Sequence, residues 1–306
     1  MKPEPRPRIG VIGLGAMGQP MALRLQAAFG PIHVWNRSAE RGAPLIDAGA
    51  IAVDDPDALF AACDVVLVML ADESAMDAVL APEAASFAAR VRGRTIINAA
   101  TIAGPASQRW ESRIREVGGA YVEAPVSGSR VPAETGQLLA MLAGAPDAIT
   151  VARMVMAPLC RQVVECGPVP AALTMKFAVN LFLIASVTGL AESAHFARAA
   201  GIDLRVWAEL VDASQMASDI SRVKTKKLRE GDFSPQAAIS NVLATNLRIV
   251  EAARAAGVPV PLAEATLGLY ERAAAEGLGA LDMIGVVDAF HDSGVLANHR
   301  RADAPS

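Results

Sequence analysis

A short stretch near the N-terminus decides the fold: Ile9-Gly10-Val11-Ile12 runs directly into Gly13-Leu14-Gly15-Ala16-Met17-Gly18. The apolar run is typical of a buried strand, and residues 17–28 have the spacing of a helix. In a G-x-G-x-x-G turn between a strand and a helix, the first glycine allows the turn. The second glycine lets the backbone approach a pyrophosphate, and the third lets helix and strand pack closely. The helix N-terminus adds free N–H groups that favour phosphate. We therefore expect the turn to bind a dinucleotide through Gly13, Leu14, Gly15, Ala16, Met17 and Gly18.

The rest of the first half repeats this alternation of strand and helix. Short apolar runs predict strands at residues 8–12, 32–35, 65–70, 95–98, 120–122 and 137–143. Apolar strands without period-two alternation suit a parallel sheet that is covered on both faces. Strands that alternate with helices indicate a doubly wound α/β domain. The first half is therefore expected to be a Rossmann domain.

The second half changes character after Cys166, where strand signals largely stop. Helical patterns occupy residues 170–200, 205–216, 235–256, 261–276 and 283–291. We expect an α/β Rossmann domain over residues 1–166 and an all-α domain over residues 167–306, joined by a long interdomain helix. The longest apolar run, residues 177–191, is shorter than the ~20 residues of a membrane span, so a buried helix is the better interpretation.

Composition narrows the function classes. The chain has 306 residues, is 53% hydrophobic and carries 28 Lys+Arg against 32 Asp+Glu, for a formal net charge of -4. This balance excludes a disordered chain and gives no basic excess for nucleic acid. Three cysteines without a C-x-x-C pair indicate a reducing compartment, and the polar, proline-rich start is unlike a signal peptide. We expect a cytoplasmic protein without a membrane partner.

Two residues after the second predicted strand bear on the choice of dinucleotide. NAD-selective folds usually place Asp or Glu at this point to bind the ribose hydroxyls, whereas this chain has Asn36 and Arg37. A guanidinium attracts a 2′-phosphate and can bond to it in a bidentate manner. We therefore expect Asn36 and Arg37 to bind the cofactor and NADP(H) to be preferred over NAD(H). Leu70, at the end of the strand at 65–70, is also expected to contact the cofactor.

Four segments resemble the β-hydroxyacid dehydrogenases related to 3-hydroxyisobutyrate dehydrogenase. Residues 13–22 are similar to the cofactor motif of that family, and Glu123-Ala124-Pro125-Val126-Ser127-Gly128-Ser129 is similar to its substrate-binding motif. Residues 128–138 resemble the glyoxylate and succinic semialdehyde reductase branch. Lys176 and Asn180 match the catalytic Lys-x-x-x-Asn of the long interdomain helix. The resemblance extends from about residue 8 to residue 290.

The resemblance implies that the protein interconverts a small 3-hydroxy acid and its semialdehyde by hydride transfer to or from a nicotinamide. Lys176 would act as general acid/base, and Asn180 would support both the lysine and the substrate. Ser127 and Gly128 would bind the substrate carboxylate, and Thr101 would contact both cofactor and substrate. The family also implies a homodimer or a higher homo-oligomer.

Elementary chemistry favours the same role for Lys176. Lys176 and Asn180 are four residues apart, so they share one face of a helix within the apolar run at residues 175–184. Burial there would lower the pKa of the lysine toward neutrality, as proton transfer requires. The alternative is a lysine whose stem covers apolar surface while its ammonium reaches water.

The chain also departs from the family. The family carries a Lys-Asp pair in a C-terminal helix, and this chain has Ala244 and Thr245 there, or Thr245 and Asn246 if one deletion is allowed. Asn98-Ala99-Ala100 replaces the usual Asp-Met-Ser before Thr101. The alternatives are an NADPH-dependent imine reductase and a catalytically silent dinucleotide-binding scaffold. The four histidines have no metal-ligand spacing, so no metal is expected.

Overall fold

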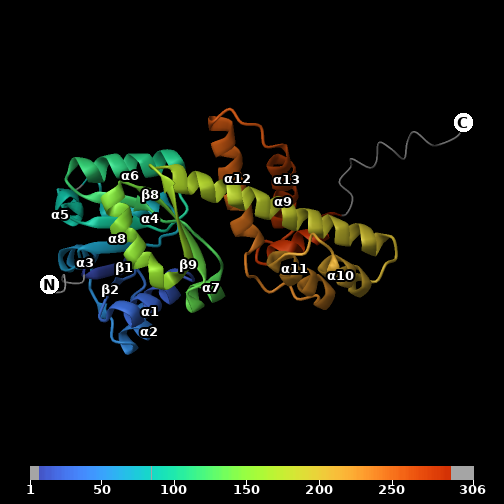
Figure 1. The fold of residues 1–306 in the computed structure, drawn as a ribbon, viewed down its shortest axis with the longest axis horizontal. Coiled ribbons are helices and arrows are strands. Elements are labelled where there is room, and N and C mark those ends of the chain that lie inside the picture. Colours follow the sequence, from blue (N-terminus) through green and yellow to red (C-terminus); the bar gives the residue numbers. More distant parts are fainter. Residues whose placement is uncertain (1–6, 84, 291–306) are drawn as a thin grey trace, which may run out of the picture. The chain divides into compact units, whose positions relative to one another are not determined.

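The computed structural model describes residues 7–83 and 85–290 (Figure 1). Contacts between residues divide the described chain into two units, one up to Lys176 and the other from Phe177 onward. The boundary therefore lies inside a long helix, nine residues after the last strand ends at Gly167. Each unit is built around its own buried core and is described by itself.

The first unit is built on a mixed sheet whose strands are ordered β3-β2-β1-β4-β5-β6-β8-β7, with β9 paired to β8. From β3 to β6 all neighbouring strands are parallel, as the sequence predicts. The strands are β1 (Ile9–Ile12), β2 (His33–Trp35), β3 (Ile51–Ala52), β4 (Val65–Val68), β5 (Thr95–Asn98), β6 (Ala120–Glu123), β7 (Val126–Ser127), β8 (Leu138–Gly144) and β9 (Cys160–Gly167).

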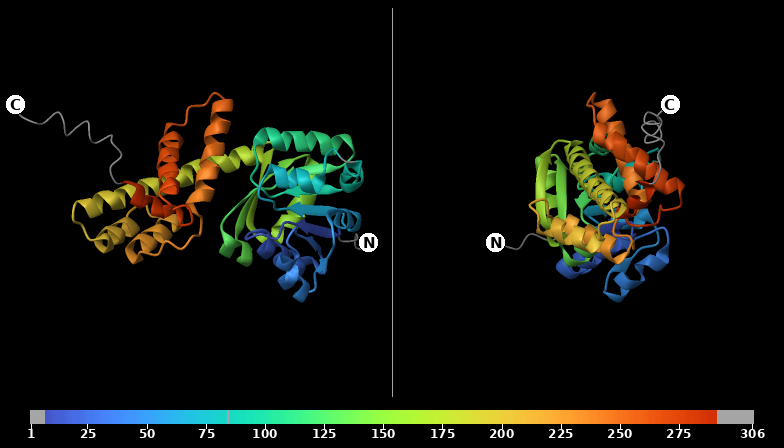
Figure 2. Two further views of the ribbon diagram at one scale, coloured as in Figure 1. Left: turned by 180° about the vertical axis from the view of Figure 1, so that it is seen from behind. Right: turned by 90° about the vertical axis from the view of Figure 1, so that its right-hand side faces the viewer.

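Helices cover both faces of this sheet (Figure 2). Successive strand residues point to opposite faces, and accordingly Val11 and Leu67 belong to one buried cluster while Ile12 and Val66 belong to another. The prediction of a doubly wound α/β unit is thus confirmed. Its helices are α1 (Gly18–Phe29), η1 (Ala39–Gly42), α2 (Ala43–Asp47), α3 (Pro56–Ala62), α4 (Glu73–Leu80), α5 (Phe87–Val91), α6 (Gly104–Glu116), α7 (Arg130–Thr135), α8 (Pro146–Met156) and η2 (Ala157–Leu159).

The far edge of the sheet differs from the purely parallel arrangement that the sequence predicts. Strand β8 runs antiparallel to β6 and β7, and β9 then runs parallel to β8. The sequence gives little sign of β9, because Arg161, Gln162 and Glu165 leave much of the strand exposed. An edge strand with polar residues is a common protection against pairing with other chains.

The second unit is helical around a separate core that includes Phe177, Ile184, Trp207 and Tyr270. Its 3-10 helix η3 covers most of the last segment predicted as helical, and residue 291 lies outside the described residues. The helices are α9 (Ala171–Ala199, begun in the first unit), α10 (Leu204–Ala213), α11 (Asp219–Glu230), α12 (Ile239–Ala255), α13 (Pro261–Ala275) and η3 (Met283–Phe290).

Helix α11 is missing from the sequence prediction because its residues are mostly polar. Two of its lysines are nevertheless buried: Lys224 Nζ donates to Asp282 Oδ1 at 2.6 Å, and Lys227 Nζ donates to the Ser234 carbonyl at 2.7 Å. Buried charges need such partners. Since the partners lie far along the chain or in the next loop, hydrophobic periodicity could not reveal this helix.

Helix α9 is long and apolar enough to cross a membrane by length and composition alone, with a mean hydropathy of 1.6. Core helices of soluble proteins meet the same criterion. Leu173 packs in a core of the first unit, and Phe177 and Ile184 pack in the core of the second. These cores cover only part of the helix, because 33% of its most apolar window is buried and Phe182 and Phe196 are exposed.

Candidate active site

The glycine turn connects β1 to α1, and its three glycines are required for different reasons. Gly13 has φ +93°, and a Cβ there would lie 2.3 Å from the Met69 carbonyl oxygen. A Cβ at Gly18 would lie 1.9 Å from the carbonyl oxygen of Gly13. At Gly15, by contrast, the nearest atom is Arg41 Nη1 at 3.8 Å. The open space at Gly15 fits a phosphate group that approaches the backbone closely.

Asn36 braces this turn from the end of β2. Its Oδ1 accepts the N–H of Leu14 at 2.9 Å, and its Nδ2 donates to the Ser38 carbonyl at 2.9 Å. The N–H of Gly13 donates to the Trp35 carbonyl at 3.1 Å. Both polar atoms of the Asn36 side chain are thus used within the protein, so its direct contribution is to shape the turn.

A pocket of about 460 Å³ opens beside the turn. The predicted cofactor residues that line it are Gly13, Gly15, Asn36, Arg37 and Leu70. The other predicted cofactor residues, which are Leu14, Ala16, Met17, Gly18 and Thr101, are not among its lining residues. Arg41 also lines the pocket and was not predicted from the sequence. Arg41 lies four residues after Arg37, and this spacing of two guanidinium groups could have signalled a second anion-binding side chain.

The segment after β6 forms the short strand β7 at the edge of the sheet, and helix α7 connects β7 to β8. Val126 and Ser127 form β7 and pair with Ala140 and Leu139 of β8. Gly128 follows with φ +131°, and a Cβ there would lie 2.8 Å from Leu138 Cδ2. The backbone at Ser127-Gly128 is therefore fixed by packing, as a site that presents a hydroxyl and an N–H to a carboxylate requires.

Lys176 lies on the first turns of α9 and is half-buried. Its Nζ donates to the carbonyl oxygen of Val126, the residue immediately before Ser127. Burial lowers the pKa of Lys176 from its ordinary value of 10.5 to about 8. The first unit thus brings together Lys176, Ser127 and Gly128, which are about 50 residues apart in sequence. Asn180 is one turn further along the same helix and half-buried.

Thr101 is half-buried in the loop between β5 and α6. This loop starts from a buried polar network: Asn98 Oδ1 accepts the N–H of Ala100 at 3.0 Å, and Asn98 Nδ2 donates to the Tyr121 hydroxyl at 3.0 Å. Ser107 lies 2.8 Å from the same hydroxyl. The asparagine that departs from the family pattern therefore has a structural use, which is to set the path of the backbone just before Thr101.

The other departure from the family concerns α12. Thr245 Oγ1 donates to the Asn241 carbonyl of its own helix, and Ala244 has no polar side chain. Asn246 is buried, and its Nδ2 donates to the Ala263 carbonyl at 3.1 Å and to Thr266 Oγ1 at 2.9 Å. Asn246 thus ties α12 to α13, and no lysine stands at any of the three positions.

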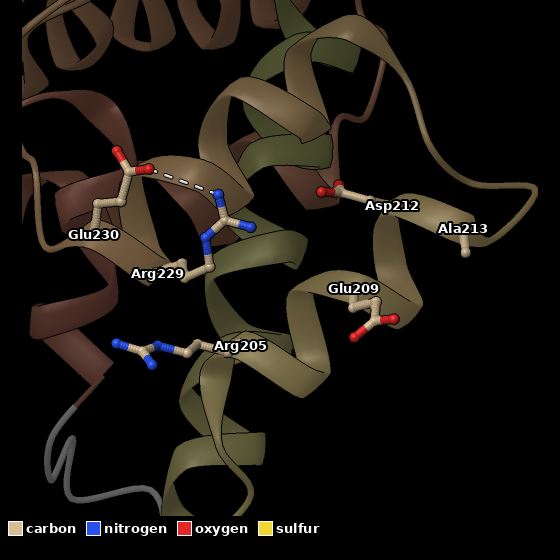
Figure 3. A pocket seen from close by; sticks show the side chains of 6 residues that line it. All are labelled: Arg205, Glu209, Asp212, Ala213, Arg229 and Glu230. Atoms are coloured by element: carbon tan, nitrogen blue, oxygen red, sulfur yellow. Dashed lines mark ion pairs between the residues drawn. The ribbon is translucent and has the colours of Figure 1, made fainter.

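A larger hollow of about 940 Å³ lies on the second unit between α10 and α11 (Figure 3). It is lined by Arg205, Glu209, Asp212, Ala213, Arg229 and Glu230, and Arg229 and Glu230 pair with each other at 3.6 Å. Mixed charges of this kind are typical of a solvated surface, so its size does not indicate a catalytic site. Across residues 7–83 and 85–290, no group of three or more His, Cys, Asp or Glu side chains is placed to hold a metal ion.

Comparisons with known proteins identify the family. Residues 8–167 match the model of the NAD binding domain of 6-phosphogluconate dehydrogenase, and residues 171–290 match the model of the NAD-binding domain of NADP-dependent 3-hydroxyisobutyrate dehydrogenase. The chain belongs to the β-hydroxyacid dehydrogenase family. As a β-hydroxyacid dehydrogenase, it binds NAD(P) and is an oxidoreductase that acts on CH–OH groups.

Two relatives illustrate the similarity of this β-hydroxyacid dehydrogenase to characterised enzymes. Glyoxylate/succinic semialdehyde reductase 2, chloroplastic, from Arabidopsis thaliana is 28% identical over 92% of this chain and 79% of its own. The 2-hydroxy-3-oxopropionate reductase of Escherichia coli is 27% identical over 96% of this chain and 100% of its own. Their names state that the first reduces glyoxylate and succinic semialdehyde and that the second reduces 2-hydroxy-3-oxopropionate.

Solved structures support the fold. The 3-hydroxyisobutyrate dehydrogenase from Salmonella typhimurium aligns with a TM-score of 0.82 at 24% identity, over 92% of this chain and 99% of its own. An imine reductase from Pseudomonas aligns with a TM-score of 0.62 at 24% identity, over 94% of this chain and 100% of its own. At this identity both comparisons speak for the fold alone.

Proposed function

We propose that the protein is an NADP-dependent oxidoreductase that interconverts a small 3-hydroxy acid and its semialdehyde, with Lys176 as general acid/base. One observation carries this proposal. The half-buried ammonium of Lys176, whose pKa is lowered to about 8 by burial, is held on the Val126 carbonyl beside Ser127 and Gly128. A proton donor next to a carboxylate-binding turn suits a substrate that has both a carboxylate and a reacting oxygen.

Each candidate site residue has a proposed role in the reaction. The bound nicotinamide supplies or accepts the hydride. Lys176 gives a proton to the substrate oxygen during reduction and takes it back during oxidation. Ser127 and Gly128 bind the substrate carboxylate, Asn180 supports the substrate and the lysine, and Thr101 lies on the loop that faces cofactor and substrate.

The preference for NADP(H) rests on two guanidinium groups. Arg37 and Arg41 line the pocket beside the glycine turn, and the end of β2 presents Asn36 in place of a carboxylate. A 2′-phosphate is attracted by such groups, whereas a carboxylate would repel it. A solved structure that is 25% identical over 92% of this chain and 99% of its own, with a TM-score of 0.80, is described as Psf3 in complex with NADP+ and 2-OPP. That complex is consistent with the same choice here.

A substrate panel tests the reaction class. We expect NADPH to be oxidised in the presence of small aldehyde acids, and the corresponding 3-hydroxy acids to be oxidised with NADP+. Cyclic imines serve as the comparison, because imine reductases share the fold. Turnover of imines without turnover of aldehyde acids would contradict the proposal, and absence of turnover with every compound would favour a silent scaffold.

The lowered pKa of Lys176 predicts opposite pH profiles for the two directions. Reduction needs the protonated lysine, so kcat/KM for the aldehyde should be flat at low pH and fall above about pH 8. Oxidation needs the neutral lysine, so its kcat/KM should rise toward about pH 8 and then level off. Initial rates in both directions measure these limbs. Loss of activity in both directions at the same pH would indicate unfolding instead of titration of Lys176.

Assembly and location belong to the same proposal. Several large apolar side chains of the second unit are exposed, among them Phe182, Phe196, Leu210 and Met216. Association between subunits would cover such side chains, so we propose a homodimer or a larger homo-oligomer. Free Cys63, Cys160 and Cys166 are consistent with a reducing, cytoplasmic environment.

A further inference from the structure

Glu123 is a buried carboxylate to which the proposed reaction gives no role. It is the last residue of β6, where it pairs with Asn98 of β5 and Ala143 of β8, and it is 0% exposed. A glutamate almost never occupies such a position unless it is hydrogen-bonded. Its partners therefore indicate why it is there.

Those partners are the first free N–H groups of α9. Glu123 Oε2 accepts the N–H of Ala172 at 3.1 Å and the N–H of Leu173 at 3.2 Å. The opening N–H groups of a helix have no partner within the helix, and its N-terminus favours negative charge. Ala172 and Leu173 are 0% and 1% exposed, so water has little access to replace the carboxylate.

Lys176 lies one helical turn after this cap. It is four residues after Ala172 and three after Leu173, so the three residues share one face of α9. Its Nζ donates to the carbonyl of Val126, three residues after Glu123. The segment from Glu123 to Val126 therefore holds α9 at two successive points, first at the helix N-terminus and then at the ammonium group itself.

We propose that Glu123 is a positioning residue, which anchors the first turn of α9 so that Lys176 is held against the Val126 carbonyl beside Ser127-Gly128. This inference rests on the proposed role of Lys176 as general acid/base. Without the anchor, two buried N–H groups lose their acceptor and the first turn of α9 must shift or fray to recover hydrogen bonds. Displacement of a catalytic group by about 1 Å can reduce turnover by about 10²-fold.

We expect the anchor to act through geometry, because Glu123 contacts the backbone of α9 and burial is what lowers the pKa of Lys176. Burial raises the pKa of Glu123 itself, whereas Ser107 and the N–H groups of Leu173 and Ala172 lower this pKa by hydrogen bonding. An uncharged side chain of the same length that keeps an acceptor oxygen should therefore replace it.

Two near-isosteric variants test this. Glu123→Gln keeps an oxygen for the two N–H groups, whereas Glu123→Met fills the same space without an acceptor. We expect Glu123→Gln to retain kcat and the pH limb near 8. Glu123→Met should lower kcat by about 10- to 100-fold and leave the KM for NADPH unchanged. The pH at which kcat/KM for reduction falls should also rise above 8, because a more hydrated ammonium group has a higher pKa. Asp55→Ala is the control for loss of a helix cap, because Asp55 Oδ1 caps α3 through the N–H of Ala58 at 2.8 Å. It should leave kcat unchanged.

Hydrogen exchange separates this inference from the proposed reaction. Faster exchange at Ala172 and Leu173 in Glu123→Met, without change in Glu123→Gln, supports the anchor independently of turnover. If Lys176 proves dispensable for turnover while this exchange pattern is found, the proposed function fails and the anchor stands as a structural one only. Native kcat, pH limb and exchange in Glu123→Met would overturn the inference. If Glu123→Met does not fold, the test rests on Glu123→Gln. A tenfold loss of kcat in Glu123→Gln, or a change in the pH at which its kcat/KM falls, would then overturn the inference.

Discussion

Replacing Lys176 with alanine is expected to lower kcat by about 10²- to 10⁴-fold, the range that general acid–base catalysis contributes. The physical reason is that the variant has no group at the Val126 carbonyl to give a proton to the developing alkoxide. Binding of NADPH should persist, because the glycine turn and its pocket are formed by other residues. Single-turnover rates and a fluorescence titration with NADPH measure the two effects separately.

The matched control is Lys226→Ala, which removes an exposed lysine from α11 and should leave kcat unchanged. The residual activity of Lys176→Ala should also lose the pH limb near 8, since the group that titrates there is gone. Near-normal turnover of Lys176→Ala would refute the assignment. A thermal melt of each variant separates lost chemistry from lost folding.

Removing Arg37 or Arg41 is expected to weaken NADPH binding by about 10- to 100-fold for each residue. A hydrogen bond to a charged group contributes about 1.5–3 kcal/mol, and each 1.4 kcal/mol corresponds to a factor of about ten in Kd. NADH lacks the 2′-phosphate, so its Kd should change little in Arg37→Ala and Arg41→Ala. Titrations of the unaltered protein and both variants with the two coenzymes measure the change in preference.

Arg115→Ala supplies the control for loss of a surface arginine, because Arg115 is exposed on the last turn of α6 and is not among the residues that line the pocket beside the glycine turn. It should bind both coenzymes as the unaltered protein does. Equal weakening of NADPH and NADH in the Arg37 or Arg41 variants would assign these residues to the pyrophosphate or adenine instead. A preference of the unaltered protein for NADH would contradict the NADP(H) proposal directly.

The sequence was informative where local pattern and chemistry coincide. Local pattern predicts strands β1, β2, β4, β5 and β6 and the helices of the second half except α11, and apolar length predicts α9. Contacts that join distant residues could not be predicted in this way. Examples are the bond between Lys176 and Val126, the pairing of Lys224 with Asp282 and the use of Asn246 to join α12 and α13.

Polar residues were the main source of error for the same reason. The exposed strand β9 and the polar helix α11 lack an apolar stripe, so a pattern of hydrophobic residues does not detect them. Glu123 stood in the quoted substrate motif, but only the fold brings it to the N–H groups of Ala172 and Leu173. A charged residue at the end of a buried strand is the signal that could have indicated such a partner.

The three glycines of the turn also have a consequence for how this motif is read across many sequences. Gly13 and Gly18 are demanded by the polypeptide itself, because a methyl group at either position would collide with backbone oxygen atoms. Selection for a folded protein alone would retain both. Gly15 has no such constraint from its own chain, so its retention reports on the presence of a ligand. A homologous protein that no longer bound a nucleotide would keep the glycines at positions 13 and 18 and could accept other residues at position 15. The residue at position 15 therefore distinguishes proteins that bind a nucleotide from proteins that have lost this function.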